Sequence, residues 1–138
     1  TSREAVAPPF VAWQFAVLPD DRIVLTSHHH PDYVAHVAVL SPEGRLLREY
    51  WHPGHLNALA TTDLDGDGKP ELLLGGVNNG RKAATLVVLD PDTMSGAARE
   101  EAPYDLQGLG KPVEKARLLF PRSCLNQRSE LYNGVTQI

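Results

Sequence analysis

The sequence has little of what marks a disulfide-stabilised, membrane-spanning or helical protein. Its 138 residues include one cysteine, Cys124, which excludes an internal disulfide. No apolar run approaches the roughly 20 residues that a membrane-spanning helix requires, and no stretch keeps a helical period for three turns. The first residues lack an initiator methionine and the apolar core of a signal peptide. We therefore expect a non-helical domain that is a portion of a longer protein.

The sequence also has no large excess of positive or negative charge. Hydrophobic residues make up 42% of the chain and charged residues 22%, which is ordinary for a soluble globular protein. The net charge of −4 equals the number of carboxylates in one short loop, so the rest of the chain is balanced. The absence of a basic patch argues against a nucleic-acid partner. The length fits one domain with a real core.

Short apolar segments separated by turn residues predict an all-β fold. Between residues 10 and 18, Val11, Trp13, Phe15 and Val17 occupy alternate positions, which predicts one strongly buried face. Trp13 and Trp51 are accordingly expected in the core. Segments 28–32 and 77–82 are polar and predict loops, and Gly75-Gly76 is interpreted as turn chemistry. The expected strands are residues 10–18, 23–26, 34–40, 46–51, 56–60, 72–74, 85–89 and 116–120.

An internal repeat indicates how these strands are organised. Residues 23–42 align without a gap on residues 72–91, at an offset of 49, and both copies predict strand, polar loop, strand and an x-Pro-acid turn. This spacing is typical of propeller blades. We expect a flexible arm over 1–9 and one β domain over 10–138, with repeats near 23–60 and 72–120. The fold class is antiparallel, propeller-blade-like sheets in two to three repeats, as an incomplete propeller or a sandwich.

The most informative stretch is TDLDGDGKPELLLGG, residues 62–76. Alternating carboxylates on a glycine-loosened loop can converge on a hard divalent cation such as Ca²⁺, and without a cation they would repel one another. A plain acidic turn is the alternative, but a turn does not require this spacing. The four carboxylates belong to Asp63, Asp65, Asp67 and Glu71, and the glycines are Gly66 and Gly68.

The motif D-x-D-x-D-G opens like an EF-hand loop, but position 12, where an EF-hand has glutamate, is Leu74. The loop instead leads into a short apolar strand. This combination resembles the FG-GAP/VCBS repeat of integrin-α-like β-propellers, over residues 56–91. The resemblance implies that Asp63, Asp65, Asp67 and Glu71 bind Ca²⁺ through their side chains, and that Lys69 binds through its backbone carbonyl.

Two further patterns, the histidines and residues 105–112, are weaker evidence for a functional site. Six histidines include the run at residues 28–30, but no metalloenzyme spacing such as H-E-x-x-H occurs. We predict solvated histidines and no transition-metal site. Residues 105–112 repeat the frame of the acidic loop with Gln107 and Leu109 in place of two aspartates, and are interpreted as a decayed or chance copy.

No catalytic motif is present, since no G-x-S-x-G elbow surrounds a serine and no acid–base pair remains outside the acidic loop. The expected function is a non-enzymatic, calcium-binding β-repeat module that presents loops to a protein or carbohydrate. The alternative is an accessory β domain of a secreted hydrolase or other carbohydrate-active enzyme. A calcium loop favours an extracytoplasmic location. Because fewer than three blades leave strand edges and sheet faces uncovered, we also predict a homo-oligomer, a dimer, with a monomeric sandwich as the alternative.

Overall fold

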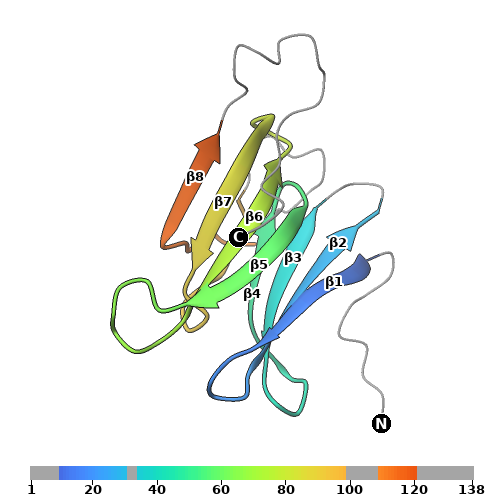
Figure 1. The fold of residues 1–138 in the computed structure, drawn as a ribbon. Coiled ribbons are helices and arrows are strands. Elements are labelled where there is room, and N and C mark those ends of the chain that lie inside the picture. Colours follow the sequence, from blue (N-terminus) through green and yellow to red (C-terminus); the bar gives the residue numbers. More distant parts are fainter. Residues whose placement is uncertain (1–9, 31–33, 99–108, 121–138) are drawn as a thin grey trace.

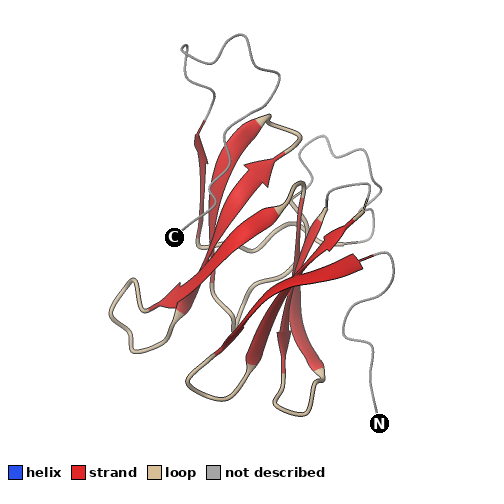
Figure 2. Ribbon diagram, turned by 45° about the vertical axis from the view of Figure 1, so that its right-hand side comes forward, coloured by secondary structure: helices blue, strands red, loops and turns tan. Residues whose placement is uncertain are grey.

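The structure, a computed structural model, describes residues 10–30, 34–98 and 109–120, and all regular structure in these ranges is β-strand (Figures 1 and 2). The chain forms two four-stranded antiparallel sheets, each with its strands in sequence order. The all-β prediction is confirmed. The first sheet consists of β1 (Phe10–Val17), β2 (Ile23–His29), β3 (Ala35–Leu40) and β4 (Leu46–His52), and the second of β5 (Leu56–Thr62), β6 (Glu71–Asn78), β7 (Ala83–Leu89) and β8 (Ala116–Phe120).

The core lies between the two sheets. Because side chains alternate between the faces of a strand, each sheet turns one set of residues toward the other sheet and one set away. Most residues of these inward sets, which we call the inner faces, are buried and apolar, and Thr26, His28, His52 and Thr85 are buried polar members. The inner face of the first sheet includes Val24, Ala35, Val37, Val39 and Tyr50, and that of the second includes Leu56, Leu72, Leu74, Val87 and Leu89.

The offset of 49 residues that aligns the two sequence segments also relates the strand registers. Ile23 pairs with Leu40 in the first sheet, and Leu72 pairs with Leu89 in the second. The correspondence continues along both strand pairs to His28 opposite Ala35 and Val77 opposite Ala84. The sheets divide the chain at residues 53–55, so β5 belongs with the second sheet.

Five strands, β2, β4, β5, β6 and β7, are longer than the predicted ranges, and the difference is largest at β2 and β6. β2 continues through His28 and His29, where a loop was expected. β6 begins at Glu71 and runs through Gly75, Gly76, Val77 and Asn78, so the two glycines are strand residues and not a turn. The physical reason is cross-strand hydrogen bonding, which holds polar residues and glycine in a ladder that local composition does not predict.

The prediction that β1 has one strongly buried apolar face was also wrong. Val11, Trp13, Phe15 and Val17 are all half exposed or more, and Trp13, expected in the core, is 55% exposed. A bulge between Ala12 and Gln14 shifts the register against β2, so these four side chains do not share one face. Trp13 instead stacks on the ring of His28, with ring centroids 5.2 Å apart.

Histidines connect the two sheets, so the prediction of solvated histidines was wrong for His28 and His52, which are buried. Nε2 of His28, on β2, lies 3.0 Å from the carbonyl oxygen of Leu56 on β5, and Nε2 of His52, on β4, lies 3.2 Å from the carbonyl oxygen of Val77 on β6. The rings of His28 and His55 stack at 4.1 Å. Burial is the main cause of lowered pKa values in all three histidines. It lowers the pKa of His28, that of His55 to about 4 and that of His52 to about 3. The charge of Arg117 lowers the pKa of His52 further.

Several sequence predictions fall outside the described residues. These are the arm over 1–9, Cys124, and most of the decayed or chance loop copy at 105–112. None of the described residues forms a helix long and apolar enough to cross a membrane.

We predict that Gly76→Ala strongly destabilises the protein. A Cβ at Gly76 would lie 1.9 Å from the backbone oxygen of His55, where neither strand can yield without breaking the pairing of β5 and β6. The expected loss in the free energy of unfolding is about 3 kcal/mol, measured by urea denaturation. Gly110→Ala is the control, because a Cβ there meets nothing within 4 Å, and its change should stay within about 0.5 kcal/mol. Equal stability of the two variants would contradict this account.

We predict that mild acid destabilises the contact between the sheets. The folded-state pKa of His52, about 3, lies below the unfolded value of 6.5, so its contribution is complete above pH 6.5 and is lost as the pH falls toward 3. This fully buried group alone should cost about 1 kcal/mol between about pH 7.5 and about pH 5.5. Urea denaturation at both pH values measures the loss, and His52→Gln should reduce it. A loss as large in this variant as in the wild type would refute the assignment to His52.

Candidate metal centre

The acidic loop is the connection between β5 and β6, and the sheet fixes both of its ends. Thr62 and Glu71 pair across the two strands, so the loop spans residues 63–70 (Figure 1, lower left). Gly66 and Gly68 have φ angles of +78° and +85°, which favour glycine. A Cβ at either position would meet nothing within 4 Å, so the backbone conformation, and not space, requires glycine there.

Asp63 organises the loop interior. Its carboxylate accepts hydrogen bonds from the backbone N–H groups of Gly66 at 2.7 Å, Asp67 at 3.2 Å and Gly68 at 2.9 Å. Carboxylates that accept several backbone hydrogen bonds commonly close a tight loop. Asp67 plays a similar, smaller part, because its Oδ1 accepts from the N–H of Lys69 at 2.8 Å.

Three of the four predicted carboxylates converge. Oxygen atoms of Asp63, Asp65 and Glu71 all lie within 4.8 Å of one another, and no other such group of acidic, histidine or cysteine side chains occurs among the described residues. Asp63 and Asp65 are exposed, whereas Glu71 is buried and its Oε2 accepts a hydrogen bond from the N–H of Leu64 at 2.8 Å. Asp67 is not part of this group. The structure therefore brings together three of the four carboxylates that the sequence analysis grouped.

A cationic side chain that the sequence analysis missed lies at this centre. Nζ of Lys115, in the segment before β8, is 2.6 Å from Asp65 Oδ2 and 2.5 Å from Glu71 Oε1. The hydrogen bond from Lys115 lowers the pKa of Asp65, and the two carboxylates together raise the pKa of Lys115. Lys115 is placed by its own backbone N–H, which donates to the carbonyl of Val88 on β7 at 2.9 Å. No local sequence signal relates a lysine 44 residues after Glu71 to this loop.

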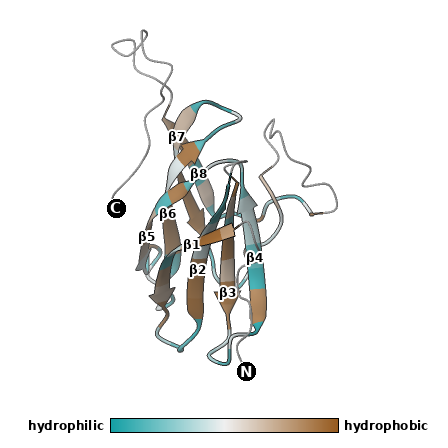
Figure 3. Ribbon diagram, turned by 90° about the vertical axis from the view of Figure 1, so that its right-hand side faces the viewer, coloured by the Kyte–Doolittle hydropathy of each residue, from teal (hydrophilic) through white to brown (hydrophobic). Residues whose placement is uncertain are grey.

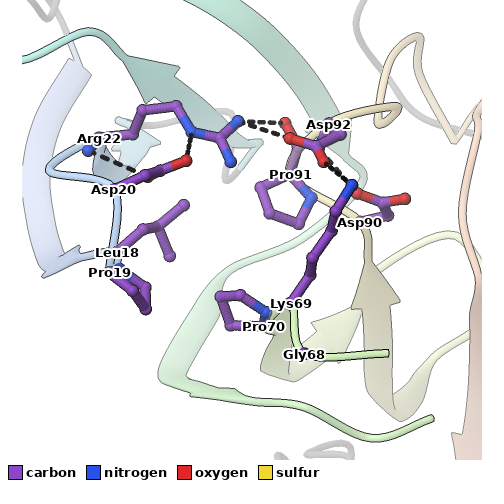
Figure 4. A pocket seen from close by; sticks show the side chains of 10 residues that line it. All are labelled: Leu18, Pro19, Asp20, Arg22, Gly68, Lys69, Pro70, Asp90, Pro91 and Asp92. Atoms are coloured by element: carbon purple, nitrogen blue, oxygen red, sulfur yellow. Dashed lines mark hydrogen bonds and ion pairs between the residues drawn. The ribbon is translucent and has the colours of Figure 1, made fainter. Parts of the chain in front are cut away.

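Lys69, predicted to offer its carbonyl, connects the loop to the rest of the molecule through its side chain. Its Nζ lies 3.3 Å from Asp92 Oδ2, and Arg22 from the β1–β2 turn reaches the other oxygen of Asp92 at 2.8 Å (Figure 4). Burial alone would raise the pKa of Asp92, but the hydrogen bonds from Lys69 and Arg22 outweigh this effect and lower it. The bonds therefore join both sheets at this end.

A cavity of about 350 Å³ opens beside these ion pairs. The β1–β2 turn, the acidic loop and the turn after β7 form its walls, and Figure 4 shows Pro19, Pro70 and Pro91 among the lining side chains. The charged groups of Asp20, Arg22, Lys69 and Asp92 in its wall bond to one another. The cavity thus has a mixed apolar and polar lining close to the acidic loop.

Comparison with known proteins finds no matching family model, no matching curated protein and no matching solved structure.

Chemically, the converged carboxylates form an oxygen-only donor set. Hard cations such as Ca²⁺ bind such sets, whereas Zn²⁺ and Cu²⁺ favour nitrogen and sulfur donors. Any ion bound by Asp63, Asp65 and Glu71 competes with the ammonium of Lys115 for two of the three carboxylates. The negative charge of the centre can therefore be balanced either by the ammonium of Lys115 or by a bound cation such as Ca²⁺.

We predict that Lys115→Met increases the affinity of the loop for Ca²⁺ by about tenfold, because the ion no longer has to displace an ammonium. The same variant should melt at a lower temperature than the wild type in chelator, since the carboxylates then lack their internal cation. Isothermal calorimetry and thermal melting measure the two effects. Lys111→Met is the matched control, because Lys111 is an exposed lysine in the same segment before β8. An unchanged affinity would show that Lys115 and Ca²⁺ do not compete.

Proposed function

We propose that this chain is a non-enzymatic, calcium-binding β-repeat module of a larger extracytoplasmic protein, which presents its loops to a protein or carbohydrate. The observation that carries the proposal is the convergence of Asp63, Asp65 and Glu71 within 4.8 Å, on a loop clamped between two paired strands. Three carboxylates gathered so closely carry more negative charge than one lysine neutralises.

The donor chemistry favours Ca²⁺ as the ion. Asp63, Asp65 and Glu71 offer oxygen atoms only, and Ca²⁺ accepts six to eight such ligands in flexible geometry. Asp67 and the backbone carbonyl of Lys69 are the further ligands that the FG-GAP/VCBS resemblance implies. A Cβ added at Gly66 or Gly68 would meet nothing within 4 Å, so neighbouring atoms leave this part of the loop room to adjust around an ion. Calcium sites of extracellular modules work in the millimolar range, which favours an extracytoplasmic location for a calcium loop.

The role of the ion is structural. The loop joins β5 to β6, its Lys69 reaches Asp92 after β7, and its cationic partner Lys115 lies just before β8. An ion at the centre therefore stabilises the connections of the whole second sheet. The loop and the β1–β2 turn lie at one end of the molecule, with the cavity between them, and this end is the surface that we propose for the partner (Figures 1 and 4).

We predict one Ca²⁺ site per chain, and a melting temperature that rises with Ca²⁺ and falls with chelator. An ion that binds only the folded state adds about 2.7 kcal/mol to the free energy of unfolding at a hundredfold excess over Kd. Calorimetric titration of chelator-treated protein measures the site directly. Asp65→Asn should weaken binding by about tenfold or more, because it removes one charged ligand.

Asp21→Asn is the matched control for this substitution. Asp21 is an exposed turn residue between β1 and β2 with φ +66°, a conformation that asparagine also adopts. It should leave the calcium affinity unchanged. No binding heat in the wild type, together with a melting temperature that ignores Ca²⁺ and chelator, would refute the proposed function.

A further inference from the structure

The first sheet exposes apolar side chains on the face that points away from the second sheet. Phe15 is 74% exposed and Val17 59% exposed. They pair with Leu25 and Ile23 of β2, so these four side chains form one continuous surface, which we call the Phe15 face. Figure 3 views the first sheet from this side of the molecule and shows hydrophobic residues along β1, β2 and β3. Contiguous exposed apolar surface of this kind marks an interaction site.

The second sheet has a corresponding surface on its own outward side. Leu118 and Phe120 of β8 are 50% and 47% exposed. Leu118 pairs with Leu86 of β7, and the neighbouring outward residue of β6 is Leu73. We call this set, Leu73, Leu86, Leu118 and Phe120, the Leu118 face. Each sheet thus carries apolar residues on both of its faces, a pattern typical of sheets that are covered on both faces.

The 49-residue repeat relates these surfaces to the core. At the repeat offset of 49 residues, Val24 and Val37 of the first sheet's inner face are equivalent to Leu73 and Leu86 of the Leu118 face. In the same way, Ile23 and Leu25 of the Phe15 face become Leu72 and Leu74, which are fully buried on the inner face of the second sheet.

The contact between the two sheets therefore joins two different faces of one repeated unit. The first sheet uses one of these faces and leaves the other, the Phe15 face, exposed. The second sheet uses the opposite one and leaves the Leu118 face exposed. The two exposed surfaces are consequently the repeat equivalents of the two surfaces that already pack together in the core.

We propose that copies of this chain associate head to tail, with the Phe15 face of one copy packed on the Leu118 face of the next. The contact repeats, between chains, the packing that the two sheets make within a chain. Unlike surfaces join in this contact, so the interface is heterologous and closes into a ring when the rotation allows.

Two copies contribute four sheets, since each chain supplies two. Four is also the smallest usual number of blades in a closed propeller. In a two-copy ring each copy uses both exposed faces, and no apolar face is left in water.

Two single substitutions test the proposal. Phe15→Asp and Leu118→Asp each place a charge on one of the two faces, at a side chain that is at least half exposed and so not needed for folding. Light scattering coupled to size exclusion, over a dilution series, should give an oligomer for the wild type and a single chain for each variant. An equimolar mixture of the two variants should form a two-chain species, because one intact Phe15 face and one intact Leu118 face remain.

Val113→Asp is the matched control. Val113 is an exposed apolar residue outside the eight strands, and its substitution should leave the oligomer intact. Circular dichroism and thermal melting verify the fold of each variant, and Phe120→Asp replaces Leu118→Asp if the latter is unfolded.

Three results would overturn the proposal. The first is a wild type that is a single chain at every concentration. The second is a variant that still dimerises alone, which would mean that like faces pair. The third is a mixture of folded variants that stays monomeric.

Discussion

The packing of one sheet face against another is the constraint on which this structure depends. The central strands β2, β3, β6 and β7 carry apolar side chains on both sides, so each sheet needs cover on two faces. The contact between the sheets covers one face of each and creates the core around Val37, Tyr50, Leu74 and Val87. The two faces that this contact leaves uncovered, the Phe15 face and the Leu118 face, are the repeat equivalents of the two faces that it covers. The 49-residue repeat therefore accounts for both the core and the exposed apolar surfaces.

The acidic loop depends on that packing indirectly. Glu71 is both the first residue of β6 and a member of the carboxylate group, so sheet formation fixes one corner of the centre. Lys115 reaches the same centre because the backbone pairing with Val88 holds it next to the sheet. The loop is thus a region of high negative charge whose balancing cation, Lys115, comes from the segment before β8, and this contact couples the loop to the second sheet.

The molecule separates its two candidate interaction regions in space. The acidic loop connects two strand ends (Figure 1), and the cavity lies beside it (Figure 4). The Phe15 and Leu118 faces lie on the flat sides of the sheets. Loops at strand ends accept changes in sequence without altering the sheets. Assembly through the sheet faces would therefore leave the loop end open to a ligand or partner.

The sequence by itself determined the β class, the number of strands, the loop position and the 49-residue repeat, because alternation, turn residues and carboxylate spacing are local properties. Tertiary structure alone decided which faces are buried, since a single bulge at Ala12 and Gln14 redirects the side chains of β1. It also decided that Asp67 stands outside the carboxylate group and that Lys115 enters it. Both depend on how distant strands approach one another, and contacts across 44 residues leave no trace in local pattern.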